Sequence, residues 1–423
     1  MTTPTRADRT KKKRRQQKRR LALWFWINGS LAAAVGIVIV LGFYLDAWHL
    51  PAASSIASDS FSGPGLTKEE NASPLAPAAN SNEEKGDTSN KAASTKSVTE
   101  ESKGIPSEEA TVSLTFVGDM MHAGKVADVV NRLGHDYPYR DAAERFKQDD
   151  LTIGNVETPI TTRGTPAKNK SFVYKSAPQM AQALSEAGMD VVNLANNHIL
   201  DQGEQGLLDT FQYLNQANIA YVGAGKNEER AYQPVIVTRN GIRIAVLGFS
   251  RVISEVSWYA GKSKPGVAAT YDAAKAVAAI KQAASKADLV IVVAHWGVEK
   301  VDKPVAYQRQ LAKAYIDAGA DLIIGGHPHV LQGFEQYKNK WIVYSLGNFV
   351  FTRATEPKSW ETMMLQAECS AKGACELQMK PYYTELGRAV PLTGAKGQAL
   401  IKRVEDISYH TRITEEGFIR PKP

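Results

Sequence analysis

Charged side chains are missing from residues 21–45, a run of 25 residues that reads LALWFWINGSLAAAVGIVIVLGFYL. An apolar segment of that length can cross a bilayer as a single helix. A cleavable signal peptide is the other interpretation, but its apolar region is usually only about 7–15 residues long. We therefore expect an uncleaved transmembrane anchor at residues 21–45, with the cleaved alternative still open.

An excess of basic residues is likewise missing from most of the chain. The formal net charge is +7, but residues 1–20 contain ten Lys or Arg and one Asp, so the other 403 residues carry −2. We therefore expect no nucleic-acid partner, and we interpret residues 1–20 as a cytoplasmic basic tail that sets the orientation of the anchor. The expected location is the cell membrane, crossed once, with the N-terminus cytoplasmic and the C-terminal part extracellular.

Aromatic residues are almost absent from residues 51–110, where Phe61 is the only one. Ser, Ala, Glu, Asn, Lys and Pro make up most of this segment. Such a composition cannot bury enough apolar surface to offset the entropy lost on ordering. We expect residues 46–110 to be a disordered extracellular linker that holds the rest of the chain away from the membrane.

Cysteine is scarce, with only two residues in the whole chain, both within ECSAKGACEL. A short turn containing Gly separates Cys369 from Cys375, and a pair held across a hairpin outside the membrane would oxidise readily. We predict a disulfide between them, with two free buried thiols as the alternative. A metal site is the weaker interpretation, because no second Cys or His pair accompanies them.

From residue 111 onward, short apolar runs alternate with segments of helical periodicity, which predicts an α/β sheet. Residues 235–249 are expected to form a hairpin, because Asn240-Gly241 suits a tight turn. The expected strands are 112–117, 151–156, 191–195, 235–237, 242–249, 289–294, 322–324 and 341–346. The expected helices are 179–187, 203–217, 272–287 and 306–318.

Polar side chains gather just after the apolar runs, and five of the eight histidines of the chain lie there. In open α/β sheets the carboxyl ends of the strands lie along one edge, so residues distant in sequence can converge at that edge. His49, His135 and His410 fall elsewhere and receive no role. The candidate residues are Asp119, His122, Asn155, Glu157, Asn196, Asn197, His198, His295, His327 and His329.

Each candidate has a structural explanation when it is taken singly. A lone His after a strand is usually a satisfied core or loop residue, Asn196 and Asn197 can end a strand through backbone bonds, and Asp119 can cap a helix. Together, however, two carboxylates, an Asn and several imidazoles form the mixed N/O ligand set that divalent transition metals prefer. In the His-Pro-His sequence at 327–329, side chains two apart would point the same way in an extended segment and could reach two adjacent ions.

The motifs GDMM, GNVE, ANNH, HWG, GHPH and SLGNF occur in this order across residues 116–349. This arrangement resembles the poly-γ-glutamate capsule biosynthesis family called CapA or PgsA, whose fold is similar to calcineurin-like metallophosphoesterases. The resemblance implies an α/β fold, a four-layer α/β/β/α sandwich over residues 111–423, preceded by the single transmembrane helix. It also implies a role in making or exporting an anionic capsule polymer at the cell surface, together with membrane-embedded partner subunits.

The metallophosphoesterase pattern also implies roles for individual residues. Asp119 matches the first-strand aspartate, Glu157 lies near the bridging carboxylate, and His198 matches the histidine that faces the substrate. The catalytic residues implied are His198 and Asp119, with His198 protonating the leaving oxygen or steadying a charged intermediate. One or two divalent ions, of Mn, Fe or Zn, would generate a hydroxide and stabilise developing charge. The metal ligands implied are Asp119, Glu157, Asn197, His295, His327 and His329.

The chain departs from the phosphoesterase pattern at two positions. The usual first motif is Asp-x-His, whereas His122 here comes one residue late. The second motif usually has Asp after Gly, whereas this chain has Asn155 there, with Glu157 two residues on. Both changes affect ligands of the first metal, so a site for one ion and a site for two both stay open.

Two functions of different classes follow from these patterns. The chain is either a surface metal-dependent hydrolase acting on a phosphoester or on the polymer, or a non-catalytic component that binds nascent poly-γ-glutamate. The loop 251–266 either forms a lid over the site or only packs against the surface of the domain, and we favour the second interpretation.

Basic residues near the site would suit an anionic polymer, although a solvated loop explains them equally well. These residues are Arg163, Lys168, Lys170 and Lys175, with Lys262 and Lys264 in a second loop.

Overall fold

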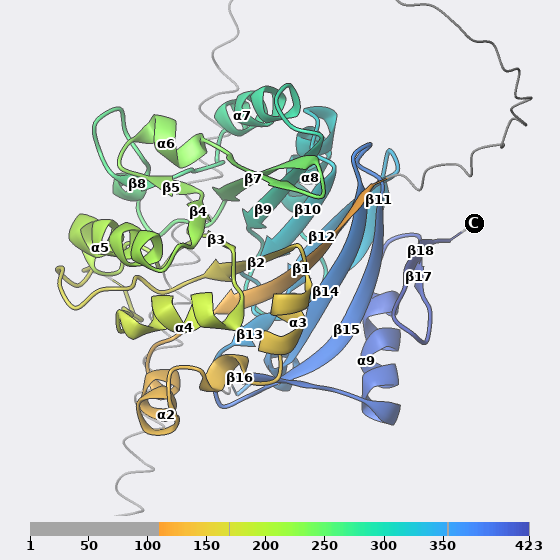
Figure 1. Ribbon diagram of the computed structural model, residues 1–423, viewed down its shortest axis with the longest axis horizontal. Coiled ribbons are helices and arrows are strands. Elements are labelled where there is room, and N and C mark those ends of the chain that lie inside the picture. The colour runs from red at the N-terminus through yellow and green to blue at the C-terminus, as the bar shows by residue number, and fades with distance from the viewer. Residues whose placement is uncertain (1–109, 169, 353–354, 423) are drawn as a thin grey trace, which may run out of the picture. The chain divides into compact units, whose positions relative to one another are not determined.

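The computed structural model describes residues 110–168, 170–352 and 355–422, all of them in one compact unit of the chain (Figure 1). The expected basic tail, the anchor at 21–45 and the linker at 46–110, except Ala110, lie outside the described residues. Within the described ranges, no helix is both long enough and apolar enough to cross a membrane.

The first large sheet is built around β1, which runs in parallel with β2, β3 and β4 on one side and antiparallel to β14 on the other. The first sheet thus joins a parallel half to an antiparallel half. Its strand order is β16 (Arg388–Pro391), β15 (Cys375–Glu385), β14 (Glu361–Ser370), β1 (Thr111–Met120), β2 (Leu151–Val156), β3 (Val191–Asn193) and β4 (Ala220–Val222), with β13 (Asn348–Val350) also paired to β1.

The second large sheet has a parallel centre with one antiparallel strand at each edge. Two further pairs of short strands are β5 (Ala224–Gly225) with β8 (Gly266–Val267), and β17 (Thr411–Ile413) with β18 (Ile419–Pro421). The strand order of the second sheet is β11 (Leu331–Tyr337), β12 (Lys340–Leu346), β10 (Leu322–Gly326), β9 (Leu289–His295), β7 (Ile242–Ser250) and β6 (Val235–Arg239).

The two sheets pack face to face and share one apolar core, to which β1 contributes Phe116 and β9 contributes Ile291. Because strands buried on both faces must be apolar throughout, this packing explains the nearly continuous apolar runs in the sequence. Helix α9 (Gly394–Asp406) adds Leu400 and Val404 to the same core.

Helices cover the outer face of each sheet (Figure 1). The first sheet carries α2 (Lys125–Leu133), α3 (Ala143–Gln148), α4 (Gln179–Ala187) and α5 (Gly203–Gln216). The second sheet carries α6 (Glu228–Tyr232), α7 (Ala274–Ala284) and α8 (Ala306–Asp317). Short 3-10 turns are η1 (Tyr137–Tyr139), η2 (Val256–Trp258) and η3 (Pro357–Trp360). The fold is therefore mixed α/β, with two central sheets between helical layers.

All eight predicted strands and all four predicted helices are present, with ends that differ by at most three residues. The predicted hairpin is confirmed as β6 and β7, and both of its turn residues, Asn240 and Gly241, have positive φ angles of 49° and 79°. The helices α2, α3, α6 and α9 were not predicted from the sequence, nor were the strands β4, β5, β8, β11 and β13 to β18.

Candidate metal centre

The candidate residues converge at the carboxyl ends of the parallel strands of both sheets. Asp119 lies near the end of β1, Asn155 near the end of β2, and His295 is the last residue of β9. His327 follows the last residue of β10, Gly326. Because the ends of both sheets meet here, residues more than 200 positions apart come into direct contact, as His327 N does with Asp119 Oδ2 at 2.9 Å.

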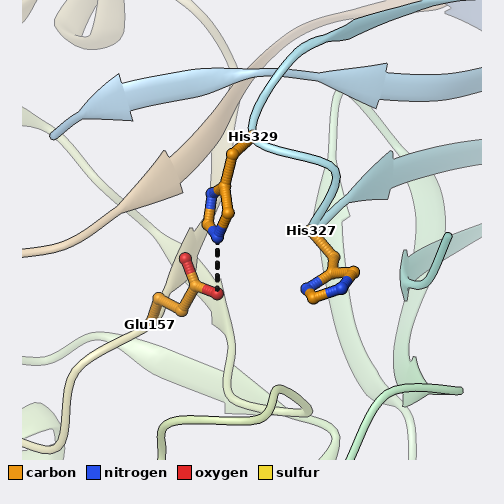
Figure 2. Close-up of side chains that lie close together, drawn as sticks. All are labelled: Glu157, His327 and His329. Carbon is orange, nitrogen blue, oxygen red and sulfur yellow. Dashed lines mark ion pairs between the residues drawn. The ribbon is translucent and has the colours of Figure 1, made fainter. Parts of the chain in front are cut away.

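Glu157, His327 and His329 form a group that can hold a metal ion (Figure 2). One ligand atom from each residue lies within 4.8 Å of the other two. Figure 2 shows the two histidines on the loop after β10 and Glu157 on a different segment, with His329 Nε2 3.9 Å from Glu157 Oε1. One carboxylate and two imidazoles are a suitable ligand set for a divalent transition metal.

The protein leaves polar atoms of this group without partners. Neither oxygen of the fully buried Glu157 accepts a well-formed hydrogen bond, although His295 Nε2 lies 3.3 Å from Oε1. Nδ1 of the buried His327 also has no partner. Since a buried carboxylate without a partner costs several kcal/mol, these orphaned atoms fit a site that takes up a cation.

His295 and Asn197 form a second side of the cluster. His295 Nε2 donates to Asn197 Oδ1 at 2.8 Å and lies close to the same Oε1 of Glu157. Glu157 is therefore shared between this pair and the pair of His327 and His329.

Asp119 is held rigidly between the two sheets. Its Oδ1 accepts from Asn155 Nδ2 at 2.8 Å and its Oδ2 accepts from the backbone N–H of His327. It also lies 3.5 Å from His329 Nδ1. A side chain at Gly326 would bring its Cβ within 2.6 Å of Asp119 Oδ1, so glycine at this position is what allows the carboxylate so close to β10.

The backbone conformation of the loop at 327–329 differs from the one we expected. The extended conformation that we assumed for the His-Pro-His sequence is wrong, because φ is 95° at His327 and 56° at His329. Such angles are uncommon for residues other than glycine and cost about 1–3 kcal/mol each. The two rings are 5.8 Å apart and tilted by 53°, so a sharp turn brings both imidazoles to one place.

Asn348, from the SLGNF motif, orients His329, and the sequence analysis gave it no role. Its Oδ1 accepts from His329 Nδ1 at 2.8 Å, while its Nδ2 donates to two backbone carbonyls, those of His329 and Ser359. This fixes the proton of His329 on Nδ1 and leaves Nε2 free to bind a metal. The position of Asn348 just after the apolar run KWIVYSL is the sequence feature that could have identified it as a site residue.

Two charged side chains, those of Asp201 and Lys170, orient His198. Its Nδ1 donates to Asp201 Oδ2 at 2.7 Å, and Lys170 Nζ lies 2.9 Å from the same nitrogen. Lys170 also contacts Asp201 Oδ1 and the carbonyl of Asn197, and its ammonium lies over the ring of Trp258. Lys170 is therefore part of the site and is not a solvated loop residue. Asp201, in the HILD sequence, was not predicted.

Burial and mutual charge shift the pKa values of the cluster. Burial, together with the negative charge of Glu157, raises the pKa of Asp119. Burial opposes ionisation of Glu157 as well, but the charges of His329 and His295 outweigh it and lower the pKa of Glu157. Burial, followed by the charges of His295 and His329, holds the pKa of His327 well below its usual value, so His327 stays neutral and able to bind a metal.

Two other candidates serve packing and hydrogen bonding. His122 contacts the hydroxyl of Tyr139, and burial lowers its pKa to about 3. Asn196 accepts from the backbone N–H groups of His198 and Ile199, and its amide donates to the carbonyl of Val156. These contacts account for both residues without a metal.

The remaining candidates lie around the site. Arg163 is exposed and pairs with Asp209, and Lys168 and Lys175 are exposed. Lys262 and Lys264 are in the loop 251–266. In that loop Trp258 is buried in the apolar core that underlies the first sheet, which favours packing over a lid. Cys369 and Cys375 are joined by a disulfide across the turn between β14 and β15.

Two known proteins that are similar in sequence to this chain both carry the name CapA. The chain is 37% identical to the capsule biosynthesis protein CapA of Bacillus anthracis, covering 68% of this chain and 71% of that protein. It is 35% identical to the PGA biosynthesis protein CapA of Bacillus subtilis (strain 168), covering 64% of this chain and 71% of that protein.

Solved structures with similar chain paths are more distant. The sulfate thiohydrolase SoxB of Thermus thermophilus matches with a TM-score of 0.37 and 16% identity, over 66% of this chain and 48% of that one. The 5′-nucleotidase of Candida albicans matches with a TM-score of 0.35 and 12% identity, over 69% of this chain and 58% of that one.

The family comparison covers the whole region that contains the candidate metal centre. Residues 113–353 match the model of the bacterial capsule synthesis protein PGA_cap. This range includes Asp119, Glu157 and both histidines of the loop after β10. The chain therefore belongs to the bacterial capsule synthesis protein family PGA_cap, the family of the CapA proteins.

Proposed function

We propose that this protein is a membrane-anchored, cell-surface component of poly-γ-glutamate capsule synthesis or export, and that it works through a divalent-metal centre of metallophosphoesterase type. The single observation that carries the metal centre is the group of Glu157, His327 and His329, with Glu157 buried and both of its oxygens lacking well-formed hydrogen bonds. Family membership supports the role in capsule synthesis.

The location and partners in this proposal rest on the sequence. The charge-free run at 21–45 would anchor the chain, and the basic residues at 1–20 would keep its N-terminus in the cytoplasm. The described part would then work outside the cell beside membrane-embedded subunits of a polymer synthase or export complex. The ion would be Mn, Fe or Zn, and one or two would be bound.

The side chains around the centre support a hydrolytic step. A divalent ion held by Glu157, His327 and His329 would stabilise negative charge on a substrate oxygen. His198 would carry the proton, because Asp201 holds its Nδ1–H and so leaves Nε2 for the substrate. Asp119, fixed between the sheets, would hold the loop after β10 in place through the His327 N–H.

The proposal is tested in cells that depend on this protein for their capsule. The full chain, purified in detergent, should contain stoichiometric metal, and Glu157→Gln and His327→Ala should each lose both the metal and surface polymer. Glu376→Gln, the same change at an exposed glutamate, is the matched control. Normal capsule from both site variants would refute a functional metal centre.

A second function has the same site but a different substrate. The Asp201–His198 pair beside a metal centre also suits a metal-dependent phosphoesterase acting on a surface substrate other than poly-γ-glutamate. Turnover of a generic phosphodiester by the metal-loaded chain, lost in His198→Gln, together with normal capsule in that variant, would favour this alternative.

A further inference from the structure

Arg251 stands out among the charged residues at the edge of the metal centre. It directly follows β7, whose last residue, Ser250, is the register partner of His295 on β9. The backbone N–H of Arg251 donates to the carbonyl of His295 at 2.8 Å. Arg251 is therefore attached to the backbone of a candidate metal ligand.

The segment that starts at Arg251 runs along the rim of the site. Three residues later, Ser254 Oγ donates to the carbonyl of Asn197 at 3.0 Å. Residues 251–254 thus connect the backbones of two candidate ligands, His295 and Asn197. A side chain from this segment is well placed to meet a substrate bound at the metal centre.

The guanidinium of Arg251 is stacked against two tyrosine rings. It lies 3.9 Å from the ring centroid of Tyr271 and 5.0 Å from that of Tyr307. Both rings are themselves fixed to the backbone. The Tyr271 hydroxyl accepts from Ile253 N at 3.3 Å, and the Tyr307 hydroxyl exchanges bonds with both N–H and C=O of Gly297.

This half-buried arginine has no carboxylate partner within the described residues. Two half-buried arginines that do have one are Arg309, paired with Glu335, and Arg403, paired with Glu361, whereas Arg230 resembles Arg251 in lying on a tyrosine ring without an ion pair in the described part of the chain. Lys170, the other cation close to the centre, is neutralised by Asp201. Arg251 thus carries a positive charge without a carboxylate partner among the residues described, on a segment whose backbone is bonded to His295.

A stacked guanidinium keeps the N–H groups in its plane available. This fork matches the two oxygens of a carboxylate or phosphate, and the rigid stack reduces the entropy lost on binding. A lysine at this position would supply the charge without the fork. The arrangement is therefore suited to recognising a carboxylate or phosphate group.

We propose that Arg251 determines substrate specificity by binding a free α-carboxylate of a γ-linked glutamate chain whose neighbouring unit lies at the metal centre. Every unit of such a polymer carries one free α-carboxylate, so a fixed cation beside the centre would select this polymer and set its register. This inference rests on the proposed function, because it takes the polymer as the substrate.

The test measures binding of a fluorescent γ-linked glutamate oligomer to the metal-loaded full chain in detergent. Arg251→Gln should weaken binding about ten- to a hundredfold, as expected for loss of charge-assisted, paired hydrogen bonds. Arg251→Lys should fall between this variant and the wild type. The matched control is Arg412→Gln, which removes the same charge from an exposed position in β17. An oligomer with amidated α-carboxylates should bind the wild type as weakly as the normal oligomer binds Arg251→Gln.

Results that contradict the role of Arg251 can be distinguished from results that contradict the proposed function. Equal oligomer affinity in Arg251→Gln and Arg412→Gln would overturn the role of Arg251. The same conclusion would follow if Arg251→Gln lost binding of inorganic phosphate but still bound the oligomer as the wild type does. Metal content is measured in each variant, and it should stay at the wild-type value in Arg251→Gln. Normal capsule in Glu157→Gln and His327→Ala cells would refute the proposed function, whatever Arg251 binds.

Discussion

Glu157→Gln offers a direct thermodynamic test of the metal centre. In the metal-free protein the Glu157 carboxylate is fully buried, has no well-formed hydrogen bond, and lies beside the second buried carboxylate, Asp119. The substitution keeps the shape and removes the charge. Because the charges of His329 and His295 offset the burial of this carboxylate and lower its pKa, we expect the unfolding temperature of the metal-free variant to stay close to that of the wild type and not to exceed it.

The stabilisation by added metal should change far more than the stability of the metal-free protein. An ion present at 100 times its dissociation constant stabilises the folded state by about 2.7 kcal/mol. The described part has about 310 residues, and an unfolding entropy of about 2.1 cal/mol/K per residue then gives an upward shift of about 4 °C. Loss of a residue that only hydrogen-bonds to a metal ligand lowers metal affinity by up to about 100-fold. If Glu157→Gln lowers the metal affinity by that factor, the upward shift in unfolding temperature falls below about 1 °C.

The assay is differential scanning calorimetry of the full chain in detergent, first with a chelator and then with Mn²⁺, Fe²⁺ or Zn²⁺. Glu376→Gln, which removes an exposed carboxylate paired with Arg420, should keep the full metal shift. If Glu157→Gln and the wild type show equal metal shifts, Glu157 is not a ligand. A large fall in the stability of the metal-free variant would show that its carboxylate is paired.

Two further predictions concern residues around the centre. Asn348→Ala removes the acceptor that orients His329, so metal affinity by isothermal titration should fall about 10- to 100-fold while Asn218→Ala, on an exposed turn, leaves it unchanged. For His122, burial lowers the folded-state pKa from 6.5 to about 3, so below pH 6.5 only the unfolded chain takes up the proton and stability is lost as pH falls. The loss is about 2 kcal/mol at pH 5. In urea unfolding at pH 7 and pH 5, His122→Gln should lose correspondingly less stability than the wild type, and an unchanged pH dependence would contradict a neutral buried imidazole.

The mixed α/β fold, and the gathering of polar residues at the strand ends, could both be predicted from the amino-acid sequence. Strands buried on both faces need apolar runs such as LVIVVA, and these runs are visible without a structure. Polar residues that interrupt such runs, as Asp119 and His295 do, mark the strand ends. Since parallel strands place their carboxyl ends along one edge, the gathering of these residues was predictable.

The antiparallel part of the first sheet was much less visible. β14 and β15 mix apolar with charged residues, as in ETMMLQAECS, because one face is less buried than in the parallel centre. β14 joins this antiparallel part to the rest of the sheet by pairing with β1, which lies some 250 positions away in the sequence. Local periodicity carries no information on such distant pairing.

The contacts that hold the site together become visible only in the folded chain. Lys170 touches His198 and Asn348 touches His329 from other segments of the chain, and no local pattern reveals either contact. Asp201 lies only three residues from His198, but the sequence does not show that their side chains meet. His327 and His329 have positive φ angles in a loop whose backbone is bonded to Asp119 of the other sheet. The sequence supplies the ligands, whereas the packing of two sheets supplies their orientation and partners, because contacts between distant segments form only when the chain has folded.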